Sequence, residues 1–369
     1  MDCIDEHRRT PTWETSEHGP TPTSKGLRTK KIAWTVTSSW AISSHMDDEP
    51  EKGAIVRIFV AGATGALGRP LVPMLVARGH EVVGMTRTES KRDLLTRLGA
   101  KPVVADALDP EAVGRAVSEA EPEVIVHELT AIPTSFNLRG MERDFVTTNR
   151  LRTEGTDYLL SAGRAAGVRR FVAQSFASYF ARHGGPVKDE TDPLDTEPPP
   201  GLRTTLEAIH YLEDAVTGAD WVEGLVLRYG PFYGPGTSFA VDPPGELVKL
   251  IRKRQFPIVG NGAGVWSFVH IEDAATATAD AVERGAPGIY HIVDDEPAPV
   301  REWLPVAARA FGAKPPRRVP RWLGRLAAGE LAAVIMTEGR GASNAKAKRE
   351  LGWRPRYASW RRGLVEGSG

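Results

Sequence analysis

The chain has 369 residues, of which 41% are hydrophobic and 25% are charged, a composition typical of globular proteins with one large domain or two modest ones. Lys plus Arg and Asp plus Glu both number 47, so the zero net charge gives no electrostatic reason to expect nucleic acid or an anionic membrane as a partner. A single cysteine, Cys3, excludes an internal disulfide and a multi-cysteine zinc site, and the sequence has no run of about 20 apolar residues with which to span a membrane.

The first segment, residues 1–52, is rich in Thr, Ser, Pro and charged residues and lacks a sustained hydrophobic period. A segment with no apolar face has little to bury. We therefore expect a disordered N-terminal extension, whose removal leaves folding unchanged.

From residue 53 strands alternate with helices, which predicts a parallel sheet covered by helices. The expected helices include 67–78, 150–166 and 206–216, and the six expected strands are 55–61, 81–85, 102–105, 124–127, 170–174 and 224–228. Six parallel strands make a doubly wound, Rossmann-type α/β sheet, here over 53–230. After residue 231 Gly and Pro become frequent, which predicts a smaller C-terminal substrate-binding lobe over 231–369.

Three glycines lie between the first strand and the first helix, at Gly62, Gly65 and Gly68. The first permits a tight turn, the second lets the backbone approach a pyrophosphate, and the third lets helix and strand pack closely. The helix N-terminus then holds the anion. This context predicts a dinucleotide site.

The end of the second strand indicates which dinucleotide is bound. NAD-selective proteins usually present Asp or Glu there to the ribose 2′-hydroxyl, but this strand ends in Met85, Thr86 and Arg87. A guanidinium at Arg87 can pair with a 2′-phosphate, and Lys91 supplies a second cation nearby. We therefore expect NADP rather than NAD.

Together these segments resemble the extended and atypical short-chain dehydrogenase/reductase family, which includes nucleotide-sugar epimerases and dehydratases. The similar motifs lie at 62–68, 104–109, 123–130, 171–179, 227–236, 268–273 and 344–353. The resemblance implies an active-site serine at Ser175. It also implies cofactor contacts from Gly62, Thr64, Gly65, Ala66, Leu67, Gly68, Asp106, Ala107, Leu129, Thr130, Gly230, Pro231 and Phe232.

The family's catalytic pair, a tyrosine followed four residues later by lysine, is missing. None of the tyrosines in the chain has lysine at that spacing. If Glu213 matches the acid that ends the family's helix motif, the tyrosine position falls on Thr205 and the lysine position on Ile209. Neither side chain exchanges a proton near neutral pH.

Two other residues are candidates for the proton transfer. His210 titrates near neutral pH, although it points about 100° away from Ile209 around the helix. Glu128 follows the fourth strand beside the expected nicotinamide. The alternative interpretations are that His210 is only a packed side chain and that Glu128 is an acid that faces water at the end of the strand.

The residues just before the motif at 268–273 also differ from those of the nucleotide-sugar members of the family. Those members carry an Arg-Asp pair where this chain has Trp266 and Ser267. An apolar or aromatic substrate gains a stacking surface at Trp266, while Arg228 and Ser175 remain candidates for substrate binding. We therefore expect a non-nucleotide substrate.

The sequence favours an NADP(H)-dependent oxidoreductase or epimerase that acts on a carbonyl or secondary alcohol of a small molecule. An NADP(H) sensor without turnover, or a non-redox isomerase or dehydratase on the same fold, is the alternative. We expect a cytoplasmic protein with no metal, no nucleic-acid partner and no membrane partner, and leave a homodimer open.

Overall fold

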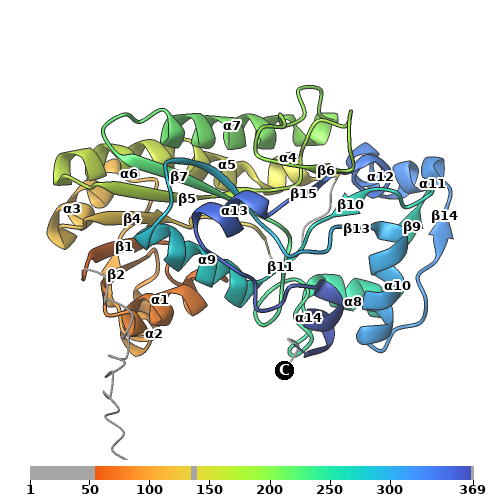
Figure 1. Ribbon diagram of the computed structural model, residues 1–369, viewed down its shortest axis with the longest axis horizontal. Coiled ribbons are helices and arrows are strands. Elements are labelled where there is room, and N and C mark those ends of the chain that lie inside the picture. Colours follow the sequence, from red (N-terminus) through yellow and green to blue (C-terminus); the bar gives the residue numbers. More distant parts are fainter. Residues whose placement is uncertain (1–54, 134–138, 367–369) are drawn as a thin grey trace, which may run out of the picture. The chain divides into compact units, whose positions relative to one another are not determined.

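A computed structural model of the chain describes residues 55–133 and 139–366 (Figure 1). The expected disordered extension over 1–52 lies outside the described residues.

Seven parallel strands form the central sheet, which confirms the predicted Rossmann-type α/β fold. Across the sheet the order is β12-β7-β5-β4-β1-β2-β3. Their bounds are β1 Arg57–Ala61, β2 Glu81–Thr86, β3 Lys101–Val104, β4 Val124–His127, β5 Arg170–Phe176, β7 Glu223–Tyr229 and β12 Gly288–Ile292. The carboxyl ends of parallel strands meet at one edge, outside which such sheets bind ligands.

The prediction of six strands was wrong by one, because β12 comes from the chain after residue 231. This strand pairs with β7 from Gly288 opposite Leu225 to Ile292 opposite Tyr229. Helix α9, Ile271–Glu283, also belongs to this later part of the chain and packs against α1, Gly68–Ala77. A five-residue strand within a Gly- and Pro-rich stretch gives only a weak sequence signal.

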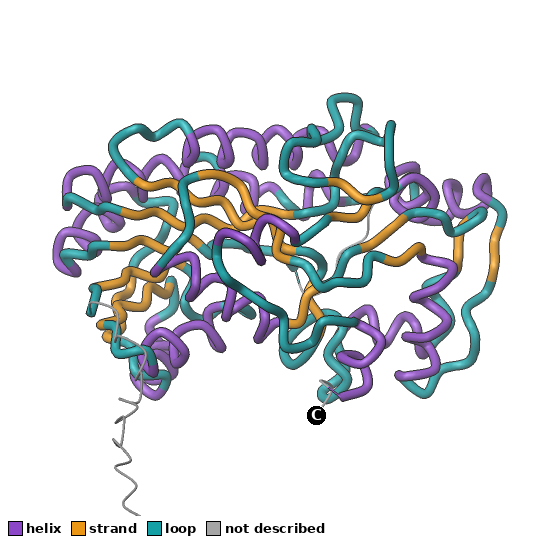
Figure 2. Tube along the Cα trace, in the orientation of Figure 1, coloured by secondary structure: helices purple, strands orange, loops and turns teal. Residues whose placement is uncertain are grey.

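Helices cover both faces of the sheet (Figure 2). On one face α1 and α9 bury an apolar cluster that includes Leu71, Val126 and Tyr229. On the other, the cluster around Phe59 and Phe171 packs under α3, α6 and α7. The bounds are α2 Arg92–Arg97, α3 Pro110–Ala120, α4 Met141–Asp144, α5 Val146–Arg152, α6 Glu154–Ala166 and α7 Arg203–Thr217, with 3-10 turns η1 Glu89–Lys91 and η2 Pro200–Leu202.

The single helix predicted over 150–166 is divided into α5 and α6 at Thr153, where ψ is −82°. The Thr153 hydroxyl donates to the carbonyl of Asn149 at 3.1 Å, a local side-chain bond that often bends helices. The break ends α5 at Arg152.

The C-terminal part of the chain builds a second apolar core around Trp303, with Phe239, Phe268 and Trp360 against it. One short strand, β6 Val187–Lys188, lies earlier in the chain. The elements of the C-terminal part besides β12 and α9 are β8 Phe232–Tyr233, α8 Glu246–Arg252, β9 Ile258–Val259, β10 Val265–Trp266, β11 Val269–His270, β13 Ala298–Pro299, α10 Val300–Ala310, β14 Arg318–Val319, α11 Arg321–Ala328, α12 Glu330–Glu338, β15 Gly341–Ala342, α13 Ala345–Glu350 and α14 Trp360–Glu366. The proposed boundary at residue 230 stays a prediction.

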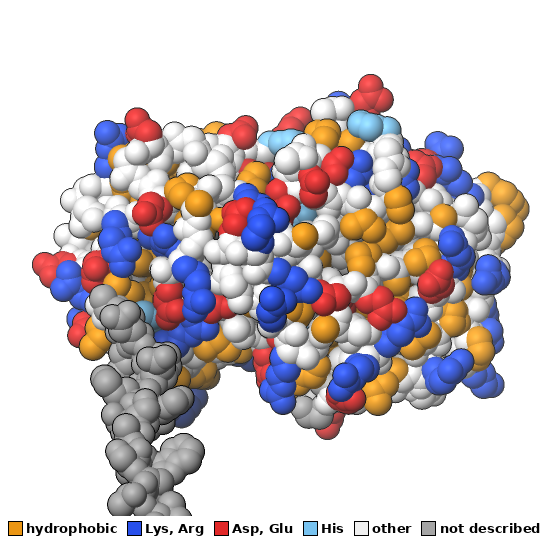
Figure 3. Space-filling view, in the orientation of Figure 1, with side chains coloured by type: hydrophobic (Ala, Val, Ile, Leu, Met, Phe, Trp, Pro, Cys, Tyr) orange, Lys and Arg blue, Asp and Glu red, His pale blue; other side chains and the backbone are white. Residues whose placement is uncertain are grey.

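Acidic and basic side chains are interspersed over the face shown in Figure 3, in keeping with the zero net charge. Within the described residues, no helix is both long and apolar enough to cross a membrane.

Candidate cofactor and active site

The glycine turn fits tightly against the end of β4. Gly62 has φ of +96°, and a Cβ placed there would lie 2.5 Å from the carbonyl oxygen of Glu128. A Cβ at Gly68 would lie 2.5 Å from the carbonyl oxygen of Gly62. Both positions therefore require glycine. Gly65 is exposed at the start of α1, where a side chain would obstruct an approaching pyrophosphate, so the turn fits a dinucleotide.

The other predicted residues of this turn divide by exposure. Ala66 is exposed, Thr64 is partly exposed, and Leu67 is buried in the core cluster beneath α1. Thr64, Gly65 and Ala66 are therefore accessible to solvent, while Leu67 anchors the turn in the core.

Arg87 follows β2 directly and is exposed. No hydrogen bond or ion pair joins its guanidinium to another described residue. After β3, Asp106 is exposed and accepts a bond from the Leu108 amide at 3.0 Å, and Ala107 is buried. These positions are compatible with the predicted adenosine contacts, which stay predictions.

Glu128 lies at the carboxyl end of β4 and is only 5% exposed. The Tyr229 phenol donates to its Oε1 at 3.2 Å, while its Oε2 has no partner among the described residues. Burial raises the pKa of Glu128 to about 8 despite this hydrogen bond, so the side chain is mainly a neutral acid at pH 7. Glu128 is therefore a candidate proton donor next to the glycine turn.

Leu129 and Thr130 continue from Glu128. The Leu129 amide donates to Nδ1 of His127 at 3.3 Å, and Thr130 is exposed.

At the end of β7, Gly230 packs so closely that a Cβ would lie 2.0 Å from the carbonyl oxygen of Ser267. The carbonyl of the next residue, Pro231, accepts from Val269, and the Phe232 ring lies 5.4 Å from that of Tyr229.

Ser175 and Arg228 face each other across β5 and β7, and both bind the carboxylate of Glu213 on α7. The Ser175 hydroxyl donates to Oε1 at 2.6 Å, and Arg228 donates to Oε1 from Nε at 2.8 Å and to Oε2 from Nη2 at 2.6 Å. All three side chains are buried. A substrate anion would have to break this ion pair to reach Arg228, so that role stays a prediction.

The two positions matched to the family's tyrosine and lysine are buried on α7. Thr205 accepts a hydrogen bond from Nδ2 of Asn149 at 3.3 Å. Ile209 packs in an apolar cluster with Phe145, Ala177 and Phe180. That these two positions replace the family's tyrosine and lysine stays a prediction.

His210 and Trp266 are the remaining residues that the sequence predicts for the site. His210 is partly exposed on α7, and no hydrogen bond or ion pair joins its ring to a described residue. Trp266 packs 5.0 Å from Trp303 and 5.8 Å from Phe268 in the C-terminal core. A catalytic role for His210 and a stacking role for Trp266 stay predictions.

Sequence reasoning missed a hydrogen-bonded chain that fixes α5 to β4. His127 accepts the Leu129 amide at Nδ1, so its other nitrogen, Nε2, carries the proton and donates to Oγ1 of Thr156 at 3.1 Å. Thr156 in turn donates to the carbonyl of Arg152 at 2.7 Å. Burial lowers the pKa of His127 to about 4, which keeps this arrangement neutral and fixed.

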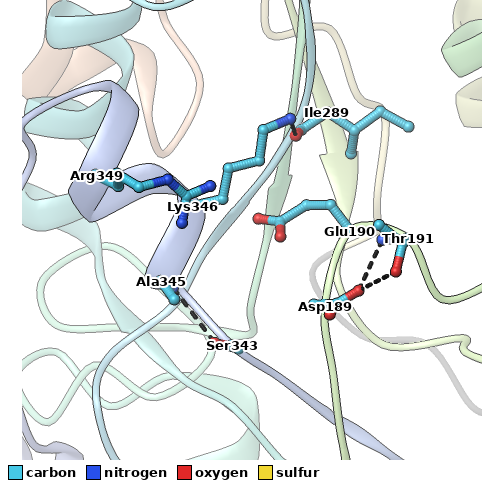
Figure 4. A pocket seen from close by; sticks show the side chains of 8 residues that line it. All are labelled: Asp189, Glu190, Thr191, Ile289, Ser343, Ala345, Lys346 and Arg349. Carbon is cyan, nitrogen blue, oxygen red and sulfur yellow. Dashed lines mark hydrogen bonds between the residues drawn. The ribbon is translucent and has the colours of Figure 1, made fainter.

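A pocket elsewhere in the fold lies beside β12, between the β6 loop and α13 (Figure 4). Its lining includes Asp189, Glu190, Lys346 and Arg349. Lys346 donates to the carbonyl of Ile289 at 2.8 Å, and Glu190 accepts from the His291 amide at 2.8 Å. Its mixed charges are therefore partly engaged within the chain, and none of the predicted site residues lines it.

Comparison with known proteins identifies a family of dinucleotide-dependent enzymes. The model of the NAD dependent epimerase/dehydratase family matches residues 58–292. A Streptomyces protein named 3-diazoavenalumate denitrifying reductase is 48% identical over 314 residues, which cover 84% of this chain and 99% of that protein.

Two more distant relatives show the range of reactions on this fold. A ketoreductase from Stigmatella aurantiaca, named for a farnesyl dihydroquinoline oxide, is 29% identical over 70% of this chain and 74% of its own length. The structure of Thermus thermophilus UDP-glucose 4-epimerase in complex with NAD superimposes with a TM-score of 0.64 and 26% identity, covering 85% of this chain and 97% of that one.

Proposed function

The chain belongs to the NAD dependent epimerase/dehydratase family, and from this membership we propose that it is an NADP(H)-dependent reductase that replaces the diazo group of a small organic acid with hydrogen. As a family member it is an NAD(P)-dependent oxidoreductase. The finer proposal is supported by 48% identity to the relative named 3-diazoavenalumate denitrifying reductase, together with the prediction, made through Glu213, that Thr205 and Ile209 replace the family's proton-transferring pair.

Loss of that pair fits the chemistry of a diazo group. A reduced nicotinamide, when bound, supplies a hydride. With a diazo group in its diazonium form, the net change is R–N₂⁺ plus H⁻ giving R–H plus N₂, so the protein supplies no proton. Carbonyl reduction instead requires a proton for the developing alkoxide, which is a task for a general acid.

The residues have distinct roles in this proposal. The turn at Gly62, Gly65 and Gly68 holds the pyrophosphate, and Arg87 pairs with the 2′-phosphate, which favours NADP over NAD. The remaining cofactor contacts come from Thr64, Ala66, Leu67, Asp106, Ala107, Leu129, Thr130, Gly230, Pro231 and Phe232. Ser175, Glu213 and Arg228 hold β5, β7 and α7 in place beneath the reacting groups.

A ketoreductase is the second candidate, and Glu128 is the observation that favours it. This acid is neutral near pH 7, and its Oε2 has no described partner, so it can donate a proton to a carbonyl oxygen beside the glycine turn. His210, partly exposed and without a described partner, is a weaker donor candidate.

A matched pair of substrates tests the proposal. We would follow NADPH oxidation with 4-carboxybenzenediazonium and with 4-acetylbenzoate, which share the ring and the acid and differ in the reducible group. Rates without protein are subtracted, because diazonium salts react with many nucleophiles. Enzyme-dependent oxidation with the diazonium alone supports the proposal, whereas oxidation with the ketone alone selects the second candidate.

A further inference from the structure

Arg152 is a buried cation without an anionic partner among the described residues. It ends α5, is 7% exposed, and makes one long hydrogen bond, from Nη1 to Oδ1 of Asn149 at 3.4 Å. No other hydrogen bond or ion pair joins its guanidinium to a described residue. A buried charge without a counter-charge is costly, so such groups are normally paired or bind a ligand.

The acids near Arg152 are already occupied. Glu213 is close enough for its charge to act on the pKa of Arg152, but both of its oxygens bind Arg228, and one also binds Ser175. Glu154, the next acid along the chain, binds Arg150 at 2.7 Å on the exposed side of the helix. Neither of these two acids therefore neutralises Arg152 by direct pairing.

Arg152 is also linked by hydrogen bonds to the position matched to the family's tyrosine. Asn149, which accepts from Arg152, donates to Thr205 at the family's tyrosine position. The His127–Thr156 chain fixes the Arg152 carbonyl to the end of β4. The guanidinium is thus two hydrogen bonds from Thr205, at the sheet edge outside which ligands bind.

We propose that Arg152 binds the carboxylate of the substrate and selects small acids over neutral compounds. A guanidinium presents two parallel N–H donors that match a carboxylate. The phosphates of the cofactor are the other available anions, but they are accounted for by the glycine turn and Arg87. The inference rests on the proposed function only in taking the substrate to be an acid.

Burial supports this assignment. Desolvation lowers the pKa of Arg152 to about 10, although the smaller electrostatic effects of Tyr179 and Glu213 raise this pKa. Burial also raises the pKa of Tyr179 to about 12, so its phenol stays protonated, and no hydrogen bond joins that phenol to a described residue. A bound carboxylate would offset the cost of the cation and can accept a bond from such a phenol.

The test is equilibrium binding, which does not depend on turnover. Calorimetry on the full chain saturated with NADP⁺ would compare benzoate with benzamide, which has the same shape and no charge. We expect the protein to bind benzoate at least tenfold more tightly than benzamide. Arg152→Gln should weaken benzoate binding roughly 10- to 100-fold and benzamide binding less than threefold, because a charge-assisted hydrogen bond is lost.

Arg150→Gln is the matched control, since it removes the same charge from the exposed face of the same helix, and it should leave both affinities unchanged. If Arg152→Gln does not fold, Arg152→Lys keeps the charge without the two-pronged geometry and should show a smaller loss with benzoate alone. Equal binding of benzoate and benzamide by the unaltered protein, or equal losses in the variant, would overturn the proposal. A preference for benzoate that Arg152→Gln abolishes, without any diazo turnover, would instead uphold Arg152 and reject the proposed function.

Discussion

Ser175 donates its hydroxyl proton to Oε1 of Glu213 at 2.6 Å, the same oxygen that accepts from Nε of Arg228. The only proton of this hydroxyl is therefore committed within the protein. We expect Ser175→Ala to slow diazo turnover less than tenfold, since its main loss is a buried hydrogen bond to a charged group. That loss should lower the free energy of unfolding by about 1.5–3 kcal/mol, measured by urea denaturation.

Ser178→Ala is the control, because Ser178 follows in the same segment but lies beyond the end of β5, and it should change neither quantity. If Ser175→Ala slowed turnover by about two orders of magnitude or more, with unchanged NADPH affinity, Ser175 would have a direct catalytic role instead.

Glu213→Gln should be among the most destabilising single substitutions in α7. It leaves the buried Arg228 without its counter-charge, and loss of one partner from such a pair costs about 3–5 kcal/mol. Urea denaturation would compare it with Glu207→Gln, an exposed acid on the same helix, for which we expect a change below about 0.5 kcal/mol. Similar values for the two variants would show that the pair contributes little to stability.

Arg87→Asp should reduce or reverse the preference for NADPH over NADH, because it places a like charge beside the 2′-phosphate. We expect the ratio of the two dissociation constants to change at least tenfold, measured by fluorescence titration. Arg97→Asp, an exposed residue on α2, is the control for net charge. Equal affinities for NADPH and NADH in the unaltered protein would exclude the proposed role of Arg87.

Glu128 should make the protein less stable as the pH rises. Its pKa is about 8 in the folded state and about 4.5 when unfolded, so between these values the unfolded chain binds fewer protons than the folded one. Stability then falls by about 1.4 kcal/mol per pH unit for one such group. The buried His127 acts in the opposite direction only below about pH 6.5, because its pKa is lowered. The clearest window is therefore pH 6.5–8.

Glu128→Gln keeps the shape and the neutral state and should remove about half of this decline, as measured by urea denaturation at several pH values, because burial also raises the pKa of Asp294 to about 8. Glu119→Gln, on the exposed face of α3, should leave the slope as it is. If the slope with Glu128→Gln matches that of the unaltered protein, Glu128 is ionised in the folded state. Under the proposed function, Glu128→Gln should also retain diazo turnover within about tenfold. If the protein is instead a ketoreductase, the same substitution should lower its rate of ketone reduction by about 100-fold or more.

Local patterns in the sequence predicted the parallel sheet and the glycine turn, because both depend on short-range spacing. Gly68 is required by a contact with nearby Gly62 and Gly62 by a contact with the distant Glu128, but the spacing of the glycines alone indicated the turn. Strand β12 was missed, since five residues among Gly and Pro carry little pattern of their own.

The site depends on long-range contacts that a single sequence does not reveal. Ser175 and Arg228 meet through Glu213 only because β5 and β7 pair in one particular register. Arg150 and Arg152 look equivalent in the sequence, yet they lie about 200° apart around the helix. One is exposed and paired with Glu154, and the other is buried, a difference that only tertiary packing decides.

Isotope transfer from the cofactor to the product would show whether this protein reduces a diazo group. The protein would be incubated with 4-carboxybenzenediazonium and NADPH carrying deuterium at C4 of the nicotinamide, with N₂ release and the label in the product measured together. We predict one N₂ released per NADPH oxidised and benzoate labelled with deuterium at the carbon that carried nitrogen. N₂ release without NADPH oxidation, or NADPH oxidation without N₂ and without label in benzoate, would contradict the account.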